Sequence, residues 1–435
     1  MSATKTSNQI IEALIDNLKD TRQRTLELVD GLNQQQLIGP KLDTVNPLIW
    51  EIGHVAYFYE FWILRHIDGS DSFLDNADEL YDSINIAHDD RWDLPLPSLE
   101  ETKHYMQQVH NAVIDRLKNG KRSEQDIYLS RYALFHEDMH TEAFTYTRRT
   151  LNYPTPVFAN TVTDDSDYDA GALEGDVEIE GGEYLLGAPQ DEHFCFDNEK
   201  WQHPVKVNPF AISRAATSYQ QYAAFVDDEG YKNQQFWTSE GWAWLQKNNI
   251  DHPDGWKQDT EGNWLIKEFD QWLPMRPHAA VIHINWYEAN AWCRWASRRL
   301  PTEAEWELAA SGSPDNVNEK RVYPWGNKTP TDRHTNMNSR AMRTIDVAAL
   351  PDSDSAFGCR QMIGNVWEWT ADTFNPYPGF VADMYQDYSQ PLFGQTKVLR
   401  GGAWTTRSRN IRNTWRTYYG PDRNDVFAGF RSCAT

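Results

Sequence analysis

The sequence predicts a multidomain α+β protein, in which a four-helix bundle is followed by an α+β domain with much irregular structure. The chain has 435 residues, a length that favours two domains. Its first 150 residues show apolar side chains at helical spacing, whereas from residue 177 short strand-like pieces alternate with Gly, Asn and Pro turns. Most of the nineteen tryptophans fall in the second half, which indicates a core held by large aromatic side chains.

Two helices are predicted in the first half of the bundle sequence. The first has apolar residues at helical spacing: Ile10, Ile11, Leu14 and Leu18. The second begins at Asn46-Pro47, with Pro at its first helical position, and continues to about residue 67. This second helix is apolar nearly all round, so we expect it to be deeply buried.

Two further helices complete the predicted bundle. One runs from Ser98 to Lys118, and Glu101, three residues after the candidate cap Ser98, forms a capping box with it. The other begins near Ser123 and ends before Pro154, because a residue that precedes proline avoids the helical region. Four helices with one long connection, at residues 67–97, are typical of a four-helix bundle.

The predicted domains are a bundle at residues 1–153, a linker at 154–176 and an α+β domain at 177–435. Pro, Asp, Gly and Thr dominate the linker. In the second domain we expect strands within residues 177–187, 203–213, 398–404 and 427–433, and helices within 217–230 and 302–311.

Composition limits the partners and the location. The formal net charge of −23 argues against nucleic acid and against an anionic membrane. The four cysteines form no C-x-x-C pair and are too few for a disulfide framework. We find no signal peptide and no apolar run of the roughly 18 residues that a membrane span needs. A cytoplasmic location is therefore expected.

Three histidines are candidate metal ligands. His136 and His140 are four residues apart on a predicted helix, so their imidazoles lie on one side, and His54 lies within the apolar second helix. Side chains from two facing helices of a bundle can converge on one ion, and three imidazoles leave coordination positions open for ligands. The alternatives without a metal are that His136 and His140 are a solvated pair and that His54 is a buried core histidine.

The segment from His136 to His140, HEDMH, also matches the H-E-x-x-H helix of zinc proteases. In that interpretation Glu137 would be the general base, and a third ligand would follow downstream. The helix ends soon afterwards at a proline, which disfavours a protease but leaves a zinc-dependent hydrolase as an alternative.

The second half carries a series of specific motifs, above all RLPTEAEWE (residues 299–307), GNVWEWT (364–370), VLRGGAW and AGFRSCA. In this order they resemble the formylglycine-generating-enzyme fold, a sulfatase-modifying-factor domain of C-type-lectin-like architecture. That activity needs a pair of cysteines shortly after the RGG motif, and no cysteine follows Gly402 before Cys433. We therefore expect the fold without that chemistry.

The N-terminal half resembles the DinB-type helical bundle. A DinB bundle with three histidines, joined to this second domain, is similar to the sulfoxide synthases of ergothioneine and ovothiol biosynthesis and to the related selenoneine synthases. The motifs NPLIWEIGH and HEDMHTE place His54, His136 and His140 on the iron positions of that family. The stretch FNPYPGF matches a family segment whose tyrosine, here Tyr377, acts near the iron.

The resemblance implies Fe(II) as cofactor and O2 as co-substrate. A thiol or a selenosugar would bind the iron, and a C–S or C–Se bond would form at C2 of the imidazole of Nα-trimethylhistidine, which is hercynine. Tyr377 would donate a proton or a hydrogen atom. The trimethylammonium group requires aromatic faces, for which Trp415, Tyr418 and Tyr419 are candidates.

Two departures from the family concern the chalcogen donor. Members that use γ-glutamylcysteine carry Gln before the last iron-ligand histidine, where this chain has Met139. They also carry several arginines after the second helix, where this chain has only Arg91 among aspartates. Met139 and Arg91 are therefore candidate substrate-binding residues, and a selenosugar or a simpler thiol is favoured over γ-glutamylcysteine.

Two other classes of function remain open from the sequence. A non-catalytic binding module on the same fold would hold no metal. A zinc-dependent hydrolase or a DinB-type thiol transferase would act without oxygen.

Overall fold

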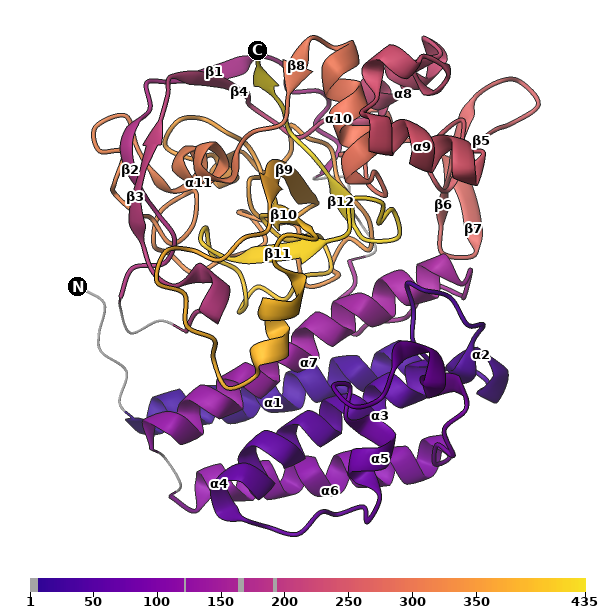
Figure 1. The fold of residues 1–435 in the computed structure, drawn as a ribbon, viewed down its shortest axis with the longest axis vertical. Coiled ribbons are helices and arrows are strands. Elements are labelled where there is room, and N and C mark those ends of the chain that lie inside the picture. Colours follow the sequence, from indigo (N-terminus) through magenta and orange to yellow (C-terminus); the bar gives the residue numbers. More distant parts are fainter. Residues whose placement is uncertain (1–6, 121–122, 163–167, 191–193) are drawn as a thin grey trace. The chain divides into compact units, whose positions relative to one another are not determined.

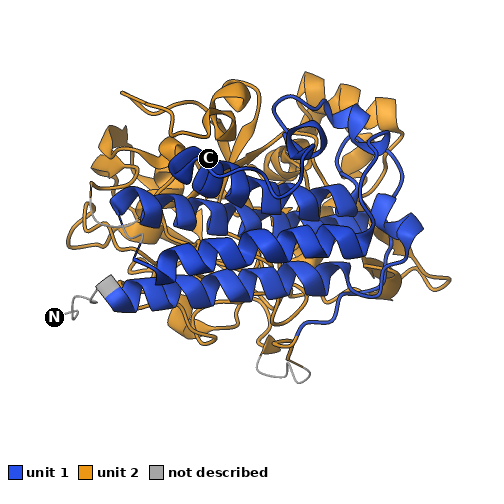
Figure 2. Cartoon of the chain, turned by 90° about the horizontal axis from the view of Figure 1, so that it is seen from below, with its two compact units in different colours: residues 1–158 blue, residues 159–435 orange. Residues whose placement is uncertain are grey.

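The structure of this chain is a computed structural model, and it describes residues 7–120, 123–162, 168–190 and 194–435. The chain divides into two compact units, residues 1–158 and 159–435, which are coloured separately in Figure 2. Residues 163–167 of the predicted linker lie outside the described residues. Tyr168, another residue of the predicted linker, packs with Ala341 and Ile345 in the core of the second unit. The bounds of the linker stay a prediction. Among the described residues, no helix is long and apolar enough to cross a membrane.

The first unit is a helical bundle. Its helices are α1 (Ser7–Val29), α2 (Gln34–Ile38), α3 (Leu48–Tyr59), α4 (His66–Asp68), α5 (Ala77–Tyr81), α6 (Leu99–Lys118) and α7 (Glu124–Thr150). A 3-10 turn, His88–Trp92, lies between α5 and α6. Helix α1 packs against α7, and α3 packs against both α6 and α7 (Figure 1). The predicted four-helix bundle is thus observed, with α2 and α5 as short additions in its connections.

The helix boundaries follow the local sequence. Capping boxes start α6 at Ser98 and α7 at Ser123, where each hydroxyl accepts from the main chain three residues on. Pro47 is the N-cap of α3 rather than its first helical residue. Every residue of α3 is buried, as its apolar composition predicts.

A π-helical turn, Glu60–Arg65, continues α3 before α4. The fully buried Glu60 carboxylate accepts hydrogen bonds from the Tyr105 hydroxyl at 2.7 Å and from the Phe73 main-chain N–H at 2.5 Å. These bonds satisfy the carboxylate from two other segments of the bundle. The sequence did not indicate this turn.

The second unit contains small sheets and helices. Its strands are β1 (Asp176–Ile179), β2 (Gly182–Leu186), β3 (His203–Val207), β4 (Phe210–Ser213), β5 (Trp256–Gln258), β6 (Trp264–Glu268), β7 (Gln271–Pro274), β8 (Arg298–Arg299), β9 (Trp367–Thr373), β10 (Lys397–Arg400), β11 (Arg416–Tyr419), β12 (Ala428–Gly429) and β13 (Cys433–Ala434). Its helices are α8 (Tyr219–Asp227), α9 (Ser239–Asn248), α10 (Trp286–Trp295) and α11 (Glu303–Ser311). The sheets have the strand orders β1-β4-β13-β8, β11-β10-β9-β12, β2-β3 and β5-β6-β7. The predicted strands and the two predicted helices are present, while α9, α10, β5 to β9 and β11 were not predicted.

The specific motifs of this unit meet in buried ion pairs. Arg400 of the RGG motif bonds Glu303 at 2.7 Å and Glu307 at 2.6 Å, both on α11. Arg431 of AGFRSCA holds Glu368 of GNVWEWT with two bonds of 2.6 and 2.8 Å. Motif residues far apart in sequence therefore pair in the core, where each charge needs its partner.

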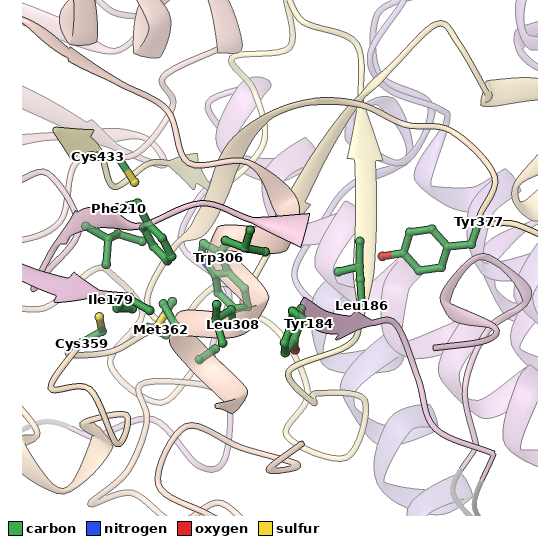
Figure 3. Close-up of a cluster of buried hydrophobic side chains, with 14 residues drawn as sticks. Ile179, Tyr184, Leu186, Phe210, Trp306, Leu308, Cys359, Met362, Tyr377 and Cys433 are labelled. Carbon is green, nitrogen blue, oxygen red and sulfur yellow. The ribbon is translucent and has the colours of Figure 1, made fainter. Parts of the chain in front are cut away.

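A hydrophobic cluster surrounds α11 (Figure 3). Trp306 and Leu308 of that helix pack with Tyr184 and Leu186 of β2, and Tyr377 belongs to the same cluster. The ring of Tyr377 is thus anchored in a rigid core although it lies in the irregular segment after β9.

Candidate metal centre

Three histidines converge inside the bundle. Helix α3 carries His54, and α7 carries His136 and His140 one turn apart. One candidate ligand atom from each ring lies within 4.8 Å of the other two, and the Nε2 atoms of His136 and His140 are 3.2 Å apart. The structure therefore brings together the three residues that the sequence proposed as ligands.

Hydrogen bonds on the other side of two rings determine their tautomers. The Nδ1 atom of His54 lies 2.8 Å from the main-chain oxygen of Tyr81, and that of His140 lies 2.6 Å from the Glu51 carboxylate. A carbonyl and a carboxylate only accept, so each Nδ1 carries the hydrogen. The Nε2 atom of each ring is left with a free lone pair, which is the form that binds a metal.

Aromatic stacking fixes the planes of the rings. Phe58 stacks on His136 with centroids 3.8 Å apart, and Trp50 stacks on His54 with centroids 4.9 Å apart. Phe58 and Trp50 lie on α3, the helix that carries His54. Because packing restricts ring rotation, the ligands are held in place before any metal binds.

Burial keeps the imidazoles of His54 and His136 neutral. It lowers the pKa of His54 to about 3, an effect to which the nearby His140 adds. Burial likewise lowers the pKa of His136 well below its ordinary value. Burial alone would raise the pKa of the Glu51 carboxyl, but His140 and Asn46 outweigh it and the net pKa is lowered. At neutral pH the site thus combines two neutral imidazoles, His54 and His136, with an ionised carboxylate behind His140.

This donor set fits a divalent transition metal. Imidazole nitrogen suits zinc, copper, iron and nickel, and three protein ligands leave positions open for substrate. His54 and His136 are buried, whereas the His140 side chain is 20% exposed. Two of the three ligands are therefore desolvated, and the third keeps some exposure to solvent.

The Glu137 carboxylate is bonded to helix α1. Its carboxylate accepts from the Arg22 guanidinium at 2.9 Å and from the Thr25 hydroxyl at 2.8 Å, both on α1. Burial alone would raise the pKa of Glu137, but Arg22 outweighs it and the net pKa is lowered. A buried carboxylate paired in this way is not available as the general base of a zinc hydrolase.

Gly53 leaves room for the residue behind His54. A Cβ at Gly53 would lie 2.2 Å from Cε1 of the Tyr81 ring. We expect Gly53→Ala to destabilise the bundle by about 1–3 kcal/mol through overpacking, despite the better helix propensity of alanine. Displacement of Tyr81 should also weaken metal binding through His54. Urea unfolding and a metal titration measure both effects, and unchanged values would mean that Tyr81 moves aside without cost.

The two substrate-binding candidates of the first unit, Met139 and Arg91, have different surroundings. Met139 is half-buried on α7 between the two ligand histidines of that helix. Arg91 donates to the Asn46 side-chain oxygen at 2.7 Å, and its guanidinium carbon lies 4.1 Å from the centroid of the Trp50 ring. The guanidinium is therefore engaged with other residues of the bundle.

Tyr377, in the second unit, is buried and closely surrounded. The Arg416 guanidinium carbon lies 4.0 Å from its ring centroid, and the His203 ring lies 4.6 Å away. Its hydroxyl has no hydrogen-bond partner among the described residues. Burial raises the pKa of Tyr377 well above its ordinary value, with Arg416 acting in the opposite direction. The phenol therefore keeps its proton at neutral pH.

The three aromatic candidates near the C-terminus do not share one face. Trp415 is buried against Trp367, with ring centroids 5.1 Å apart. Successive side chains of β11 alternate, and Tyr418 stacks on Phe374 at 4.0 Å whereas Tyr419 lies next to Arg423 in the chain's final loop. Tyr418 and Tyr419 therefore do not line the same side of their strand.

Sequence reasoning missed the residues behind the ligands. Asn46 is bonded to Glu51, Glu51 contacts His140, and Trp50 stacks on His54. None of Asn46, Trp50 and Glu51 was proposed from the sequence as a site residue. One signal was present: Glu51 is a charged residue inside the apolar segment LIWEIGH, three positions before His54. A carboxylate that is buried in this way requires a partner.

The comparison with known proteins decides the family. Residues 17–147 match the DinB superfamily, and residues 164–435 match the family described as sulfatase-modifying factor enzyme 1-like domain. Over 426 residues the chain is 34% identical to the hercynine oxygenase of Mycobacterium tuberculosis, with 97% of this chain and 98% of that protein covered. The chain belongs to the hercynine oxygenase family.

Other relatives agree with this assignment. The hercynine oxygenase of Mycolicibacterium thermoresistibile is 33% identical over 426 residues, with 96% of this chain and 94% of that protein covered. The formylglycine-generating enzyme of Thermomonospora curvata is 30% identical over 295 residues, which cover 60% of this chain and 93% of that enzyme. The predicted family resemblance and the predicted fold class, a DinB-type bundle followed by a formylglycine-generating-enzyme-like domain, are confirmed.

Proposed function

We propose that this member of the hercynine oxygenase family is an oxidoreductase that uses Fe(II) and O2 to join a chalcogen to C2 of the imidazole ring of hercynine. The product would contain a new C–Se or C–S bond. The observation that carries the proposal is the cluster of three histidines, whose candidate ligand atoms lie within 4.8 Å of one another in a chain that is similar to a hercynine oxygenase over nearly its whole length.

The ligand residues have a defined task in this proposal. His54, His136 and His140 would hold the iron, which supplies open coordination positions for the donor and for dioxygen. Neutral imidazoles with restricted rings bind without a prior proton loss or reorganisation. The partly exposed side of His140 would be the side from which small molecules reach the site.

Tyr377 is the proposed donor of a proton or hydrogen atom. Its raised pKa keeps the hydroxyl protonated, and no acceptor among the described residues competes for the hydrogen. The hydrophobic cluster and Arg416 fix the ring, so the hydroxyl is oriented before substrate binds. Trp415, Tyr418 and Tyr419 remain proposals for the site of the trimethylammonium group.

The contacts of Arg91 bear on the identity of the chalcogen donor. γ-Glutamylcysteine carries two carboxylates, and a bidentate arginine clamp is the usual means of binding such groups. Here the guanidinium is bonded to Asn46 and stacked on Trp50. Together with Met139 in place of Gln, this favours a selenosugar or a thiol with fewer carboxylates.

Oxygen uptake tests the proposal. Protein reconstituted anaerobically with Fe(II) would receive hercynine together with a selenosugar, cysteine or γ-glutamylcysteine in separate reactions. We expect hercynine-dependent oxygen uptake with one donor, most of all the selenosugar, and a product whose mass includes the new bond. Iron-loaded protein that consumes no oxygen with any donor would refute the proposal and favour a binding module.

Tyr377→Phe isolates the role of the phenol. Because the hydroxyl makes no hydrogen bond within the described residues, its removal should leave stability and metal binding unchanged. We expect turnover to fall by about 10²–10⁴-fold, the usual contribution of a positioned proton donor. Tyr418→Phe and Tyr419→Phe serve as matched variants, and a larger loss in either would assign the role to that residue instead.

A cytoplasmic location and the absence of nucleic-acid and membrane partners stay predictions from composition.

A further inference from the structure

A chain of hydrogen bonds extends from Arg91 to a ligand histidine. The Arg91 Nη1 donates to Asn46 Oδ1 at 2.7 Å, and Asn46 Nδ2 donates to Glu51 Oε1 at 2.5 Å. The other carboxylate oxygen, Glu51 Oε2, lies 2.6 Å from His140 Nδ1. Four side chains from three segments of the bundle are thus linked in series behind the metal site.

Arg91 sets the direction of the two bonds that Asn46 makes, and the Glu51 carboxylate sets the direction of the bond to His140. A guanidinium can only donate, so Asn46 must present its oxygen to Arg91 and its NH₂ group to Glu51. The Glu51 carboxylate has only acceptors, so it accepts from Asn46 and from His140. His140 must then carry its hydrogen on Nδ1, which leaves the Nε2 lone pair for the metal.

Arg91 also reaches a second ligand. Its guanidinium carbon lies 4.1 Å from the centroid of the Trp50 ring, and Trp50 stacks on His54 with ring planes inclined by 8°. One cation therefore supports two ligand histidines, through hydrogen bonds in one case and through ring stacking in the other.

We propose that Arg91 is a positioning residue of the metal centre: it orients Asn46, and Asn46 in turn holds the Glu51 carboxylate that keeps His140 in its metal-binding tautomer. This role differs from the substrate binding that the sequence suggested. It rests on the proposed function only in taking His54, His136 and His140 as ligands. Outer-sphere hydrogen bonds of this kind fix the tautomer and orientation of ligand imidazoles.

The tautomer can be measured without a metal. In metal-free protein labelled with ¹⁵N-histidine, the chemical shifts of the two ring nitrogens distinguish the hydrogen on Nδ1 from the hydrogen on Nε2, and His140→Ala assigns the signal. The measurement is made about two pH units above the ordinary imidazole pKa of about 6.5. We expect the Nδ1–H form, and an Nε2–H form in the unaltered protein would overturn the proposal.

Glu51→Gln breaks the pattern with a nearly isosteric side chain. A glutamine has one oxygen and one NH₂ group, so it cannot accept from both Asn46 and His140. If its NH₂ group faces His140, the imidazole must move its hydrogen to Nε2. We expect this tautomer to appear and the affinity for Co(II), measured by its visible absorption in competition with a chelator, to fall by about 10–100-fold.

Two double variants test whether the direction of the chain is the cause. In Asn46→Asp/Glu51→Gln, the aspartate accepts from Arg91 and from the glutamine NH₂, and the glutamine oxygen accepts from His140. The net charge is unchanged and the pattern is restored, so Nδ1–H and most of the Co(II) affinity should return. In Arg91→Met/Glu51→Gln, Asn46 is free to reverse its amide and to accept from the glutamine NH₂ group. The Co(II) affinity lost through Glu51→Gln should therefore be smaller in Arg91→Met protein than when Arg91 is present.

A matched control is Glu60→Gln, which changes a buried carboxylate on the same continuous helix that is bonded to Tyr105, Ser72 and Phe73. It should leave the His140 tautomer and the Co(II) affinity unchanged. Equal losses in Glu60→Gln and Glu51→Gln, or no rescue in either double variant, would overturn the proposal.

The two proposals fail in different ways. If the unaltered protein binds neither Fe(II) nor Co(II), the proposed function fails, while the tautomer of His140 still tests the role of Arg91. If the unaltered protein binds metal and Glu51→Gln binds it equally well with Nδ1–H retained, only the role of Arg91 is refuted.

Discussion

His136→Ala is expected to abolish stable iron binding and, with it, hercynine-dependent oxygen uptake. The variant removes one of three ligand nitrogens, the one whose Nε2 lies 3.2 Å from that of His140. Loss of a direct ligand should exceed the about 10–100-fold that outer-sphere changes cost in metal affinity. Metal content after reconstitution and dialysis, followed by oxygen uptake, measures both effects.

Structural damage must be separated from the loss of a ligand. His136 is buried and stacks on Phe58, so alanine also leaves a cavity. His140→Ala removes a ligand that is partly exposed and should give the same loss of iron with less effect on stability. The control is His104→Ala, an exposed histidine of α6. Iron binding that survives both ligand substitutions would contradict the assignment of the metal centre.

Arg431→Met is expected to destabilise the second unit by about 3–5 kcal/mol. Arg431 and Glu368 are both fully buried and share two short hydrogen bonds. Without the guanidinium, the carboxylate keeps only the Trp306 indole N–H as a side-chain donor among the described residues. An uncompensated buried charge of this kind is the main cost of breaking such a pair.

Urea unfolding followed by tryptophan fluorescence measures this effect, because sixteen of the nineteen tryptophans belong to the second unit. The double variant Arg431→Met/Glu368→Gln should recover part of the loss, since it removes the unpaired charge. The exposed pair of Lys232 and Glu229 is the control, and Lys232→Met should cost less than about 1 kcal/mol. A loss as small in Arg431→Met would show that the buried pair contributes little.

The sequence predicted the features that depend on local pattern. The helices α6 and α7 begin at serines followed three residues later by an acidic residue, and this chemistry is local. The spacing of His136 and His140 determined that both lie on one side of α7, and the apolar segment around His54 determined that it is buried. The order of motifs in the second half identified its fold.

What the sequence could not predict depends on contacts across the fold. Glu51 bonds a histidine 89 positions away, and no periodicity relates the two. The π-helical turn begins at Glu60, whose carboxylate bonds two other segments, and no sequence pattern predicted it. Helix α10 was not predicted, although its start carries a local signal, the capping box of Asn285 and Glu288.

The π-helical turn after α3 has a consequence for the sidedness of the helix that carries His54. Such a turn inserts one residue without ending the helix, and each residue of an α-helix rotates by about 100°. Beyond Glu60 the phase of the helix is therefore shifted, and counting from His54 in steps of 3.6 assigns the wrong outward directions. The direction in which side chains point before Glu60 is thus independent of the direction after it. Deletion of one residue in this turn would rotate Trp62 and its neighbours about the helix axis and leave His54 in place.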